Sequence, residues 1–132
     1  MKTRLAVITL LACVVASAAA PRKILFIGNS LTYFRDGIYY HLERLSASAN
    51  PPVVIQTGKS VQGGATLKTL WERAEPRELI GKGAFDVVVL QEDIPEIDVA
   101  SFREYARRFV GEIRKAMEKV ESRSRVVYGE RG

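Results

Sequence analysis

The segment "KILFIGNSLT", residues 23 to 32, decides the fold because its character changes abruptly. Residues 24 to 28 form an apolar run that is too short for a helix and ends in glycine, which predicts a buried strand. Gly28 lets the backbone turn sharply without a clashing Cβ atom. We therefore expect Ser30 to stand at the rim of a sheet with its hydroxyl facing a cleft. The alternative is that Ser30 or Thr32 only caps a helix or turn.

Strand-like and helix-like segments alternate along the rest of the chain. Apolar residues recur at helical spacing in three places, which are Ile38–Leu45, Leu67–Trp71 and Phe102–Val120. Further strands are predicted at Val53–Thr57, Asp86–Gln91 and Arg125–Tyr128. Parallel strands need crossover connections, and the connecting helices cover the sheet. The sequence therefore predicts an α/β domain with a parallel sheet of about four strands and helices on both faces.

The first twenty residues have the features of a secretory signal peptide. A positively charged start precedes an apolar run from Leu5 to Val15 and a small-residue cleavage site at Ala16–Ala18. We expect residues 21 to 132 to form one domain that is secreted or periplasmic, with no membrane contact after cleavage. Two alternatives are an uncleaved membrane anchor and a lipoprotein that carries its lipid on Cys13.

Composition excludes several classes of function for the mature chain. Cys13 is the only cysteine and lies in the leader, so neither a disulfide nor thiol chemistry is expected. The net charge of the whole chain is +5, and two of its basic residues lie in the leader, which is too small an excess to indicate nucleic acid. The "GKS" at residues 58 to 60 lacks the earlier glycine of a phosphate loop. No cofactor or metal is expected.

In a parallel sheet, ligands bind beyond the carboxyl ends of the strands. Three segments of this chain are predicted to lie there, namely Gly28–Thr32, Gly58–Gly64 and Gln91–Glu96. They contain "FIGNSLT", "QGGATL" and the end of "DVVVLQE", in that order. This ordered set resembles the SGNH hydrolases, also called GDSL-like esterases, and is most similar to a bacterial branch with G-N-S and L-Q-E motifs. The resemblance covers residues 23 to about 128 and implies a three-layer α/β/α sandwich of the flavodoxin-like kind.

The resemblance assigns roles to individual positions. It implies that Ser30 is the nucleophile and that the backbone N–H of Gly64 faces the oxyanion, with Gly63 as the neighbouring alternative. Gln91 lies near the position of a further oxyanion donor, where the family usually has asparagine. Asn29 replaces the aspartate of the commoner motif. If these roles hold, the hydroxyl of Ser30, the N–H of Gly64 and the side chain of Gln91 converge on one cleft.

The proton acceptor is the missing part of this site. The family places an Asp-x-x-His block near its C-terminus, and this sequence contains none. The only histidine, His41, is expected on the helix after Ser30, too far away to activate it, and is interpreted as a packing residue. Four acids crowd the third rim segment, and we interpret them as solvated loop carboxylates, although one could act as a weak base or hold a cation. They are Glu92, Asp93, Glu96 and Asp98.

The sequence therefore predicts a serine ester hydrolase-like protein, acting on small-molecule or carbohydrate esters, that is inactive or weak as written. The expected strand at Arg125–Tyr128 is followed at once by the end of the sequence, which we interpret as a C-terminally truncated or degenerate form. The alternative function is a non-catalytic carbohydrate-binding or scaffold domain with the same fold.

Overall fold

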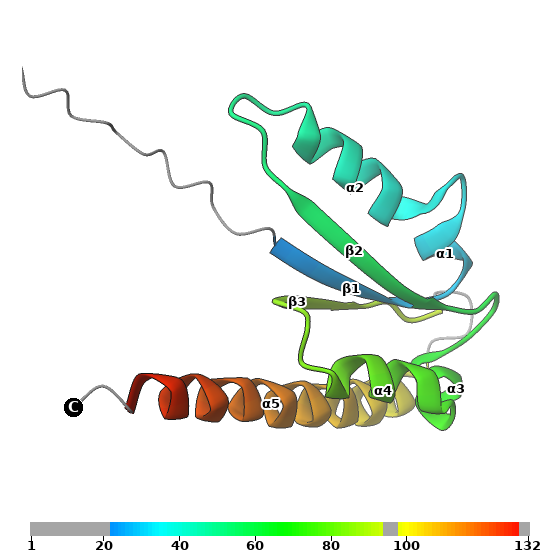
Figure 1. The fold of residues 1–132 in the computed structure, drawn as a ribbon. Helices are drawn as coiled ribbons and strands as arrows, with labels where there is room; N and C mark the ends of the chain where they lie inside the picture. The colour runs from blue at the N-terminus through cyan, green and yellow to red at the C-terminus, as the bar shows by residue number, and fades with distance from the viewer. Residues whose placement is uncertain (1–21, 94–97, 130–132) are drawn as a thin grey trace, which may run out of the picture.

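The computed structural model describes residues 22–93 and 98–129 of the chain. The predicted leader, residues 1 to 20, lies outside the described residues. Strands and helices alternate along the chain, as the sequence predicts (Figure 1). In chain order the elements are β1 (Arg22–Gly28), α1 (Ser30–Tyr33), α2 (Gly37–Ala47), β2 (Ile55–Val61), α3 (Leu67–Glu72), α4 (Ala74–Gly81), β3 (Val87–Leu90) and α5 (Val99–Gly129).

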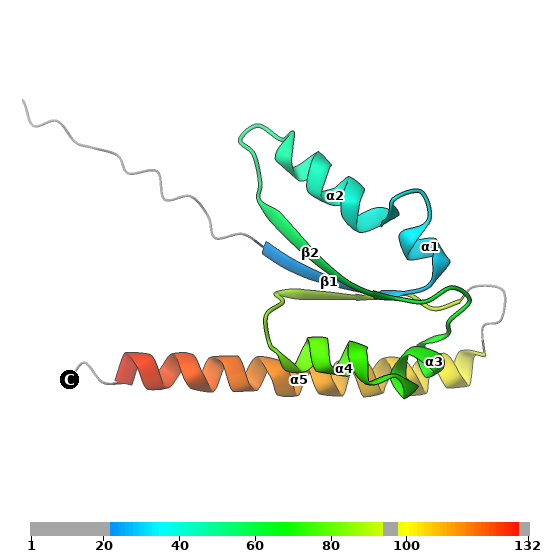
Figure 2. The same ribbon diagram turned by 45° about the vertical axis from the view of Figure 1, so that its right-hand side comes forward.

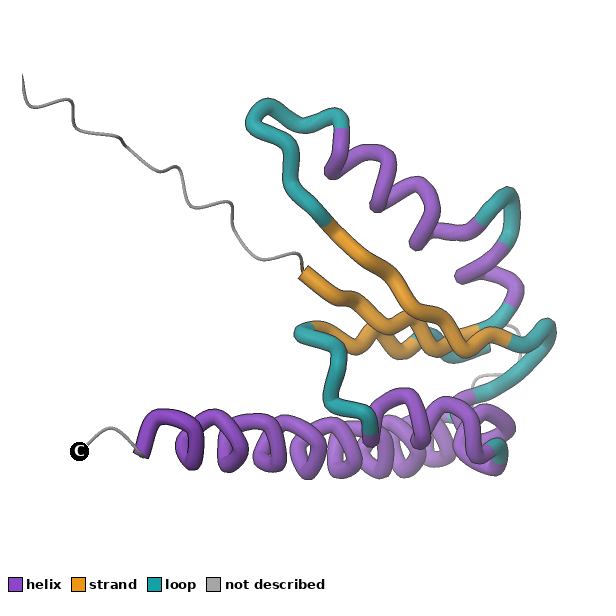
Figure 3. Tube along the Cα trace, viewed as in Figure 1, coloured by secondary structure: helices purple, strands orange, loops and turns teal. Residues whose placement is uncertain are grey.

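The three strands form one parallel sheet with β1 in the centre. The strand order is β2-β1-β3, and both outer strands run parallel to β1. Ile27 of β1 pairs with Ser60 of β2 on one side and with Leu90 of β3 on the other. The segments that follow the three strands therefore start at the same edge of the sheet (Figure 3). The predicted α/β fold with a parallel sheet is confirmed at this level.

β2 lies further along the chain than the sequence predicts. The expected strand was Val53–Thr57 with a loop from Gly58, but β2 pairs with β1 along seven residues and ends at Val61. Gly58 belongs to the strand, where it pairs with Leu25 of β1, and the ring of Phe85 packs against it. A Cβ atom added at Gly58 would lie 2.7 Å from Cζ of Phe85. This glycine makes room for an aromatic ring, so reading it as the start of a loop is wrong.

Helices lie on both sides of the sheet. α2 lies on one side, and α3, α4 and α5 lie on the other (Figure 1, Figure 2). Side chains of β1 alternate between the two sides, as they must in a strand. Leu25 and Ile27 belong to the core beneath α3 and α5, whereas the ring of Phe26 meets the ring of Tyr39 on α2 at a centroid distance of 6.1 Å. The central strand is thus buried on both faces.

The main core lies between the sheet and the helices α3, α4 and α5. Phe109 of α5 is fully buried, and its ring makes an edge-to-face contact with Trp71 at a centroid distance of 5.1 Å. The buried apolar residues around this pair are Leu25, Ile27, Ala65, Leu67, Leu70, Ile80 and Ala116. Because α3 begins directly after the segment that carries Gly64, this core also fixes where that segment lies.

The apolar stripe of α2 predicts the helix, but the residues at its two ends do not pack on the sheet. Ile38 and Leu45 are 55% and 71% exposed, whereas Leu42 is half-buried. Besides the contact of Tyr39 with Phe26, polar contacts attach α2 to β2, because Oε1 of Glu43 accepts hydrogen bonds from the backbone N–H and the hydroxyl of Thr57 at 2.8 and 2.7 Å. A helical period in the sequence therefore identified the element but not the side that packs.

The predicted fourth strand at Arg125–Tyr128 is wrong. These residues belong to α5, a single helix of 31 residues that runs from Val99 to Gly129. The segment "RVVY" has local strand propensity, but no proline interrupts the chain between Val99 and this segment, so the helix continues through it. Among the described residues the sheet has three strands.

We predict that Phe109→Ala destabilises the protein by about 3–5 kcal/mol, because it removes a fully buried ring from the core. The measurement is the free energy of unfolding from urea denaturation followed by circular dichroism. The matched control is Phe34→Ala, which removes a ring that is 69% exposed and is expected to change stability by no more than about 0.5 kcal/mol. Equal losses in the two variants would contradict the packing of α5 against the sheet.

Candidate active site

The turn after β1 is shaped by close contacts to Gly28. A Cβ atom at this position would lie 2.4 Å from Oγ1 of Thr32 and 2.7 Å from Oε1 of Gln91, so only glycine fits. Asn29 then caps α1, and its Oδ1 accepts a hydrogen bond from the N–H of Leu31 at 3.1 Å. Ser30 is the first residue of α1 and is exposed. Its predicted position at the rim of the sheet is where the structure places it.

Asn29 joins this turn to the segment after β2. Its side chain is fully buried, and its Nδ2 donates a hydrogen bond to the carbonyl of Ala65 at 3.1 Å. The contact places residues 29 and 65 side by side, and hence their neighbours Ser30 and Gly64 in the same region of the rim. Sequence reasoning treated Asn29 only as a replacement for aspartate and missed this link. A polar residue directly after a buried strand was the available signal.

Gly64 has a backbone conformation that favours glycine. Its φ angle is +63°, in the left-handed region, and a Cβ atom added there would meet nothing within 4 Å. The space above Gly64 is therefore open. At the neighbouring Gly63, by contrast, an added Cβ atom would lie 2.9 Å from the hydroxyl of Tyr33. Of the two glycines that the sequence offers, Gly64 is the one that faces free space.

Two backbone donors at this rim have no partner among the residues that the structure describes. Within residues 22–93 and 98–129, the N–H groups of Ser30 and Gly64 make no hydrogen bond, and neither does the hydroxyl of Ser30. The neighbouring N–H groups of Leu31 and Thr32 are both occupied, by the side chain and the backbone carbonyl of Asn29. No described residue therefore keeps a ligand oxygen from the N–H groups of Ser30 and Gly64.

Gln91 reaches the site but presents its oxygen rather than its N–H. Its Oε1 accepts hydrogen bonds from the N–H of Asn29 and the hydroxyl of Thr32, each at 2.9 Å. Its Nε2 donates to the backbone carbonyl of Glu92. One of the two Nε2 hydrogens is therefore directed at Glu92, and it is the oxygen that meets the turn around Ser30. Thr32, which the sequence offered only as a cap, is the second donor to Gln91.

Two ionisable candidates for a base, His41 and Glu92, are engaged elsewhere. Nε2 of His41 donates to the backbone carbonyl of Arg35 at 2.9 Å, on the exposed side of α2. Oε1 of Glu92 accepts from the N–H groups of Leu67 and Asp93 at 3.0 and 2.8 Å. Glu92 thus ties the end of β3 to the first turn of α3, which is a structural role.

The remaining acids provide no metal site among the described residues. Oδ1 of Asp98 accepts the N–H of Ala100 at 2.9 Å at the start of α5. Glu96 lies outside the described residues. In the described part of the chain there is no group of three or more His, Cys, Asp or Glu residues that could hold a metal ion. None of its helices is long and apolar enough to span a bilayer.

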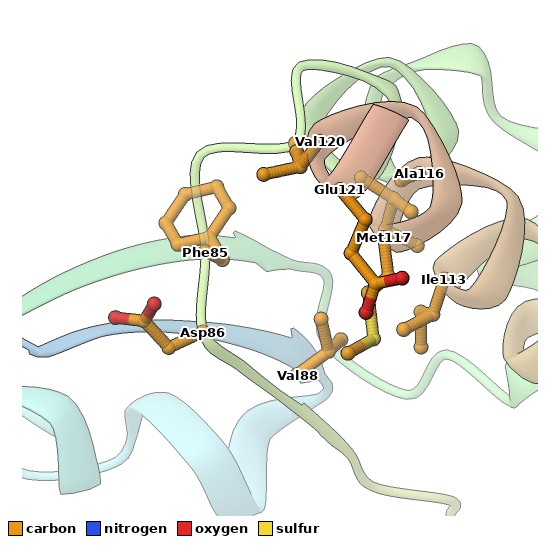
Figure 4. Close-up of a pocket in the computed structure, with 10 residues that line it drawn as sticks. Phe85, Asp86, Val88, Ile113, Ala116, Met117, Val120 and Glu121 are labelled. Carbon is orange, nitrogen blue, oxygen red and sulfur yellow. The ribbon is translucent and has the colours of Figure 1, made fainter. Parts of the chain in front are cut away.

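A cavity of about 250 Å³ lies elsewhere, between β3 and the second half of α5 (Figure 4). Its walls are mainly apolar and include Phe85, Val88, Ile113 and Met117. Asp86, which also lines it, precedes β3, so the cavity opens at the amino ends of the strands, away from Ser30. It is therefore not part of the candidate active site.

No protein-family model matches the chain, and no curated protein matches it either. The assignment of a function therefore depends on the site geometry described above.

We predict that Asn29→Asp destabilises the protein by about 1–3 kcal/mol at neutral pH. The substitution keeps the size of the side chain but replaces the buried donor to Ala65 with a carboxylate oxygen, which faces the Ala65 carbonyl without a hydrogen bond. The matched control is Gln56→Glu, the same amide-to-acid change at an exposed position of β2, where a change within about 0.5 kcal/mol is expected. Urea denaturation measures both. An Asn29→Asp variant as stable as the control variant would show that the contact with Ala65 is not formed.

Proposed function

We propose that this chain is a serine ester hydrolase-like protein of the SGNH kind, with Ser30 as the nucleophile. The observation that carries the proposal is the pairing of the Ser30 turn with the Gly64 segment through the buried Asn29–Ala65 hydrogen bond. A residue that only caps a helix need not lie beside a second segment, whereas Ser30 lies beside Gly64, whose N–H makes no hydrogen bond within the described residues. The helices on both sides of a parallel sheet support the three-layer sandwich that belongs to this proposal (Figure 2).

The chemistry follows from these groups. Oγ of Ser30 attacks the carbonyl carbon of an ester, its proton passes to a base, and the carbonyl oxygen becomes negative. The N–H groups of Ser30 and Gly64 would donate to that oxygen. Preorganised donors of this kind are worth about 3–4 kcal/mol each in mutational tests. The alcohol then leaves, and water cleaves the resulting acyl-serine to release the acid and restore the hydroxyl.

No imidazole or carboxylate of the described residues hydrogen-bonds to the hydroxyl of Ser30, so the first step has no assigned base. His41 and Glu92 are both held in other hydrogen bonds, and the hydroxyl of Ser30 contacts neither within the described part of the chain. Without a base, the rate enhancement should be limited to what the oxyanion donors and substrate binding provide, about 10³–10⁴ over water. The proposal therefore includes weak turnover of the chain as it stands.

The location and the substrate class are also proposals. The charge pattern and the apolar run of residues 1 to 20 support export by a signal peptide. The mature protein would then act in the periplasm or outside the cell. An exposed Ser30 at an open rim fits a small-molecule ester or an ester group on a carbohydrate, which can approach from solvent.

We predict that a fluorophosphonate probe labels Ser30. In this reaction Oγ of Ser30 forms a bond to phosphorus, fluoride leaves, and the proton of the hydroxyl passes to solvent. Mass spectrometry of the intact protein and of its peptides is expected to show the adduct in the wild-type protein and not in Ser30→Ala. The matched control is Ser48→Ala, which removes an exposed serine hydroxyl from the end of α2 and should leave labelling unchanged.

An assay of a short-chain aryl ester completes this test. Turnover is expected to exceed spontaneous hydrolysis by no more than about 10³–10⁴-fold. Fast turnover that is lost in Ser30→Ala would show that another group serves as base. Absence of any adduct on Ser30 would refute the assignment of Ser30 as the nucleophile.

A second candidate function is carbohydrate binding without hydrolysis, and exposed aromatic rings beside Ser30 favour it. Tyr33 ends α1 and Phe34 follows it, and both rings are exposed. Aromatic rings provide large and rigid contact surfaces at binding sites, here on the helix turn that carries Ser30.

If this second function is the correct one, Tyr33→Ala and Phe34→Ala should each weaken binding of a partly acetylated soluble oligosaccharide about tenfold. Ser30→Ala should not. Isothermal titration calorimetry measures the dissociation constants of the wild type and of the three variants. Hydrolysis of the acetyl groups that depends on Ser30 would favour the hydrolase instead.

A further inference from the structure

We propose that Gln91 is a positioning residue for Ser30. Through its side-chain oxygen it holds the turn that carries the nucleophile, and it does not donate to the oxyanion. The inference rests on the proposed function, because positioning affects a reaction only if Ser30 reacts. It also replaces the role that the sequence resemblance implied for Gln91, which was that of a further oxyanion donor.

The two hydrogen bonds to Oε1 of Gln91 bracket the nucleophile. One donor is the backbone N–H of Asn29 and the other is the hydroxyl of Thr32, so the contacts lie on both sides of Ser30 along the chain. The orientation of the amide is determined by its partners. A backbone N–H can only donate and the carbonyl of Glu92 can only accept, so the oxygen must face Asn29 and the nitrogen must face Glu92.

Gln91 is itself fixed by the sheet and by close packing. Its backbone N–H donates to the carbonyl of Ile27 at 2.9 Å, which continues the pairing of β1 with β3. Gly28 leaves just enough room for its side chain, because a Cβ atom there would lie 2.7 Å from Oε1. Asn29 and Thr32 are both buried while Gln91 is in place, so its oxygen is the partner that satisfies both donors. This oxygen therefore links the turn to β3, as the side chain of Asn29 links it to the segment after β2.

The same contact also affects the second backbone donor. The backbone N–H of Asn29 bonds to Gln91, while the side chain of Asn29 bonds to Ala65, the residue after Gly64. A shift of Asn29 would change the position of the N–H of Ser30 relative to that of Gly64. Misplacement of reacting groups by about 1 Å can cost about 100-fold in rate.

Two substitutions at position 91 test separately whether Gln91 acts through its accepting oxygen or through its donating N–H. Gln91→Met keeps the approximate length of the side chain but removes the accepting oxygen. Gln91→Glu keeps accepting oxygens and removes the side-chain N–H. The measured quantities are the maximum rate and the half-saturating probe concentration for labelling of Ser30 by the fluorophosphonate.

For a positioning residue, the maximum labelling rate should fall about 10–100-fold in Gln91→Met and by less than about threefold in Gln91→Glu. The half-saturating concentration should change little, since the probe does not touch Gln91. If Gln91 were an oxyanion donor, the maximum labelling rate should fall by the same factor in both variants. Equal losses would therefore overturn the proposal.

Variants of Thr32 provide an independent test if Gln91→Met does not fold. Thr32→Val removes the second donor and should lower the labelling rate about threefold to tenfold, whereas Thr32→Ser keeps the hydroxyl and should restore it. Loss of rate in both Thr32 variants would indicate that the methyl group matters instead of the hydrogen bond, and would also overturn the proposal.

Amide hydrogen exchange separates failure of this inference from failure of the proposed function. If wild-type Ser30 is not labelled, the hydrolase proposal is wrong. The exchange rate of the Asn29 N–H still tests the contact with Gln91. Exchange of the Asn29 N–H should be slow in the wild type and in Gln91→Glu, and at least tenfold faster in Gln91→Met. For the hydroxyl contact, exchange should be faster in Thr32→Val than in Thr32→Ser. Unchanged protection in these variants would overturn the positioning role.

Discussion

The burial of the Asn29 side chain is the constraint on which the arrangement of the rim depends. An amide that is inaccessible to water must find protein partners for its polar atoms, because an unpaired one costs about 1–3 kcal/mol. The partners of Asn29 come from two segments, Leu31 in its own turn and Ala65 after β2. The requirement of one side chain therefore brings together two segments that are 36 residues apart in sequence. Neither contact involves a charged group, so salt should affect this junction little.

The parallel sheet makes that junction geometrically available. β1 is the central strand, so the turn that carries Ser30 has a neighbouring segment on each side. The segment after β2 contributes Gly64, and the segment after β3 contributes Gln91. The core beneath the sheet keeps these segments in place, since Ala65 and Leu67 are buried there beside Phe109. Side chains that form the site and side chains that form the core therefore alternate along the same short stretches of chain.

The sequence predicted the elements better than their contacts. The strand at residues 24 to 28 was predictable because an apolar run that ends in glycine has few other interpretations. Gly58 looked like the start of a loop because the ring of Phe85, 27 positions later, is invisible to local patterns. The strand at Arg125–Tyr128 was wrong because β-branched residues at the end of a long helix follow the helix. At the site, the positions of Ser30, Gly64 and Gln91 at one rim were predictable, since each follows a strand of a parallel sheet. The direction of the Gln91 amide was not, because an amide offers both a donor and an acceptor.

That ambiguity also explains why two amides suit this site. Asn29 must donate with its side chain to the carbonyl of Ala65 and accept with the same group from the N–H of Leu31. Gln91 must accept from the Ser30 turn and donate to the carbonyl of Glu92. A carboxylate can only accept, so at either position it would leave one backbone carbonyl without a donor. At position 29 that carbonyl belongs to the residue after Gly64, at the centre of the junction. At position 91 it belongs to Glu92, on the far side from Ser30. An acid should therefore be tolerated better at position 91 than at position 29.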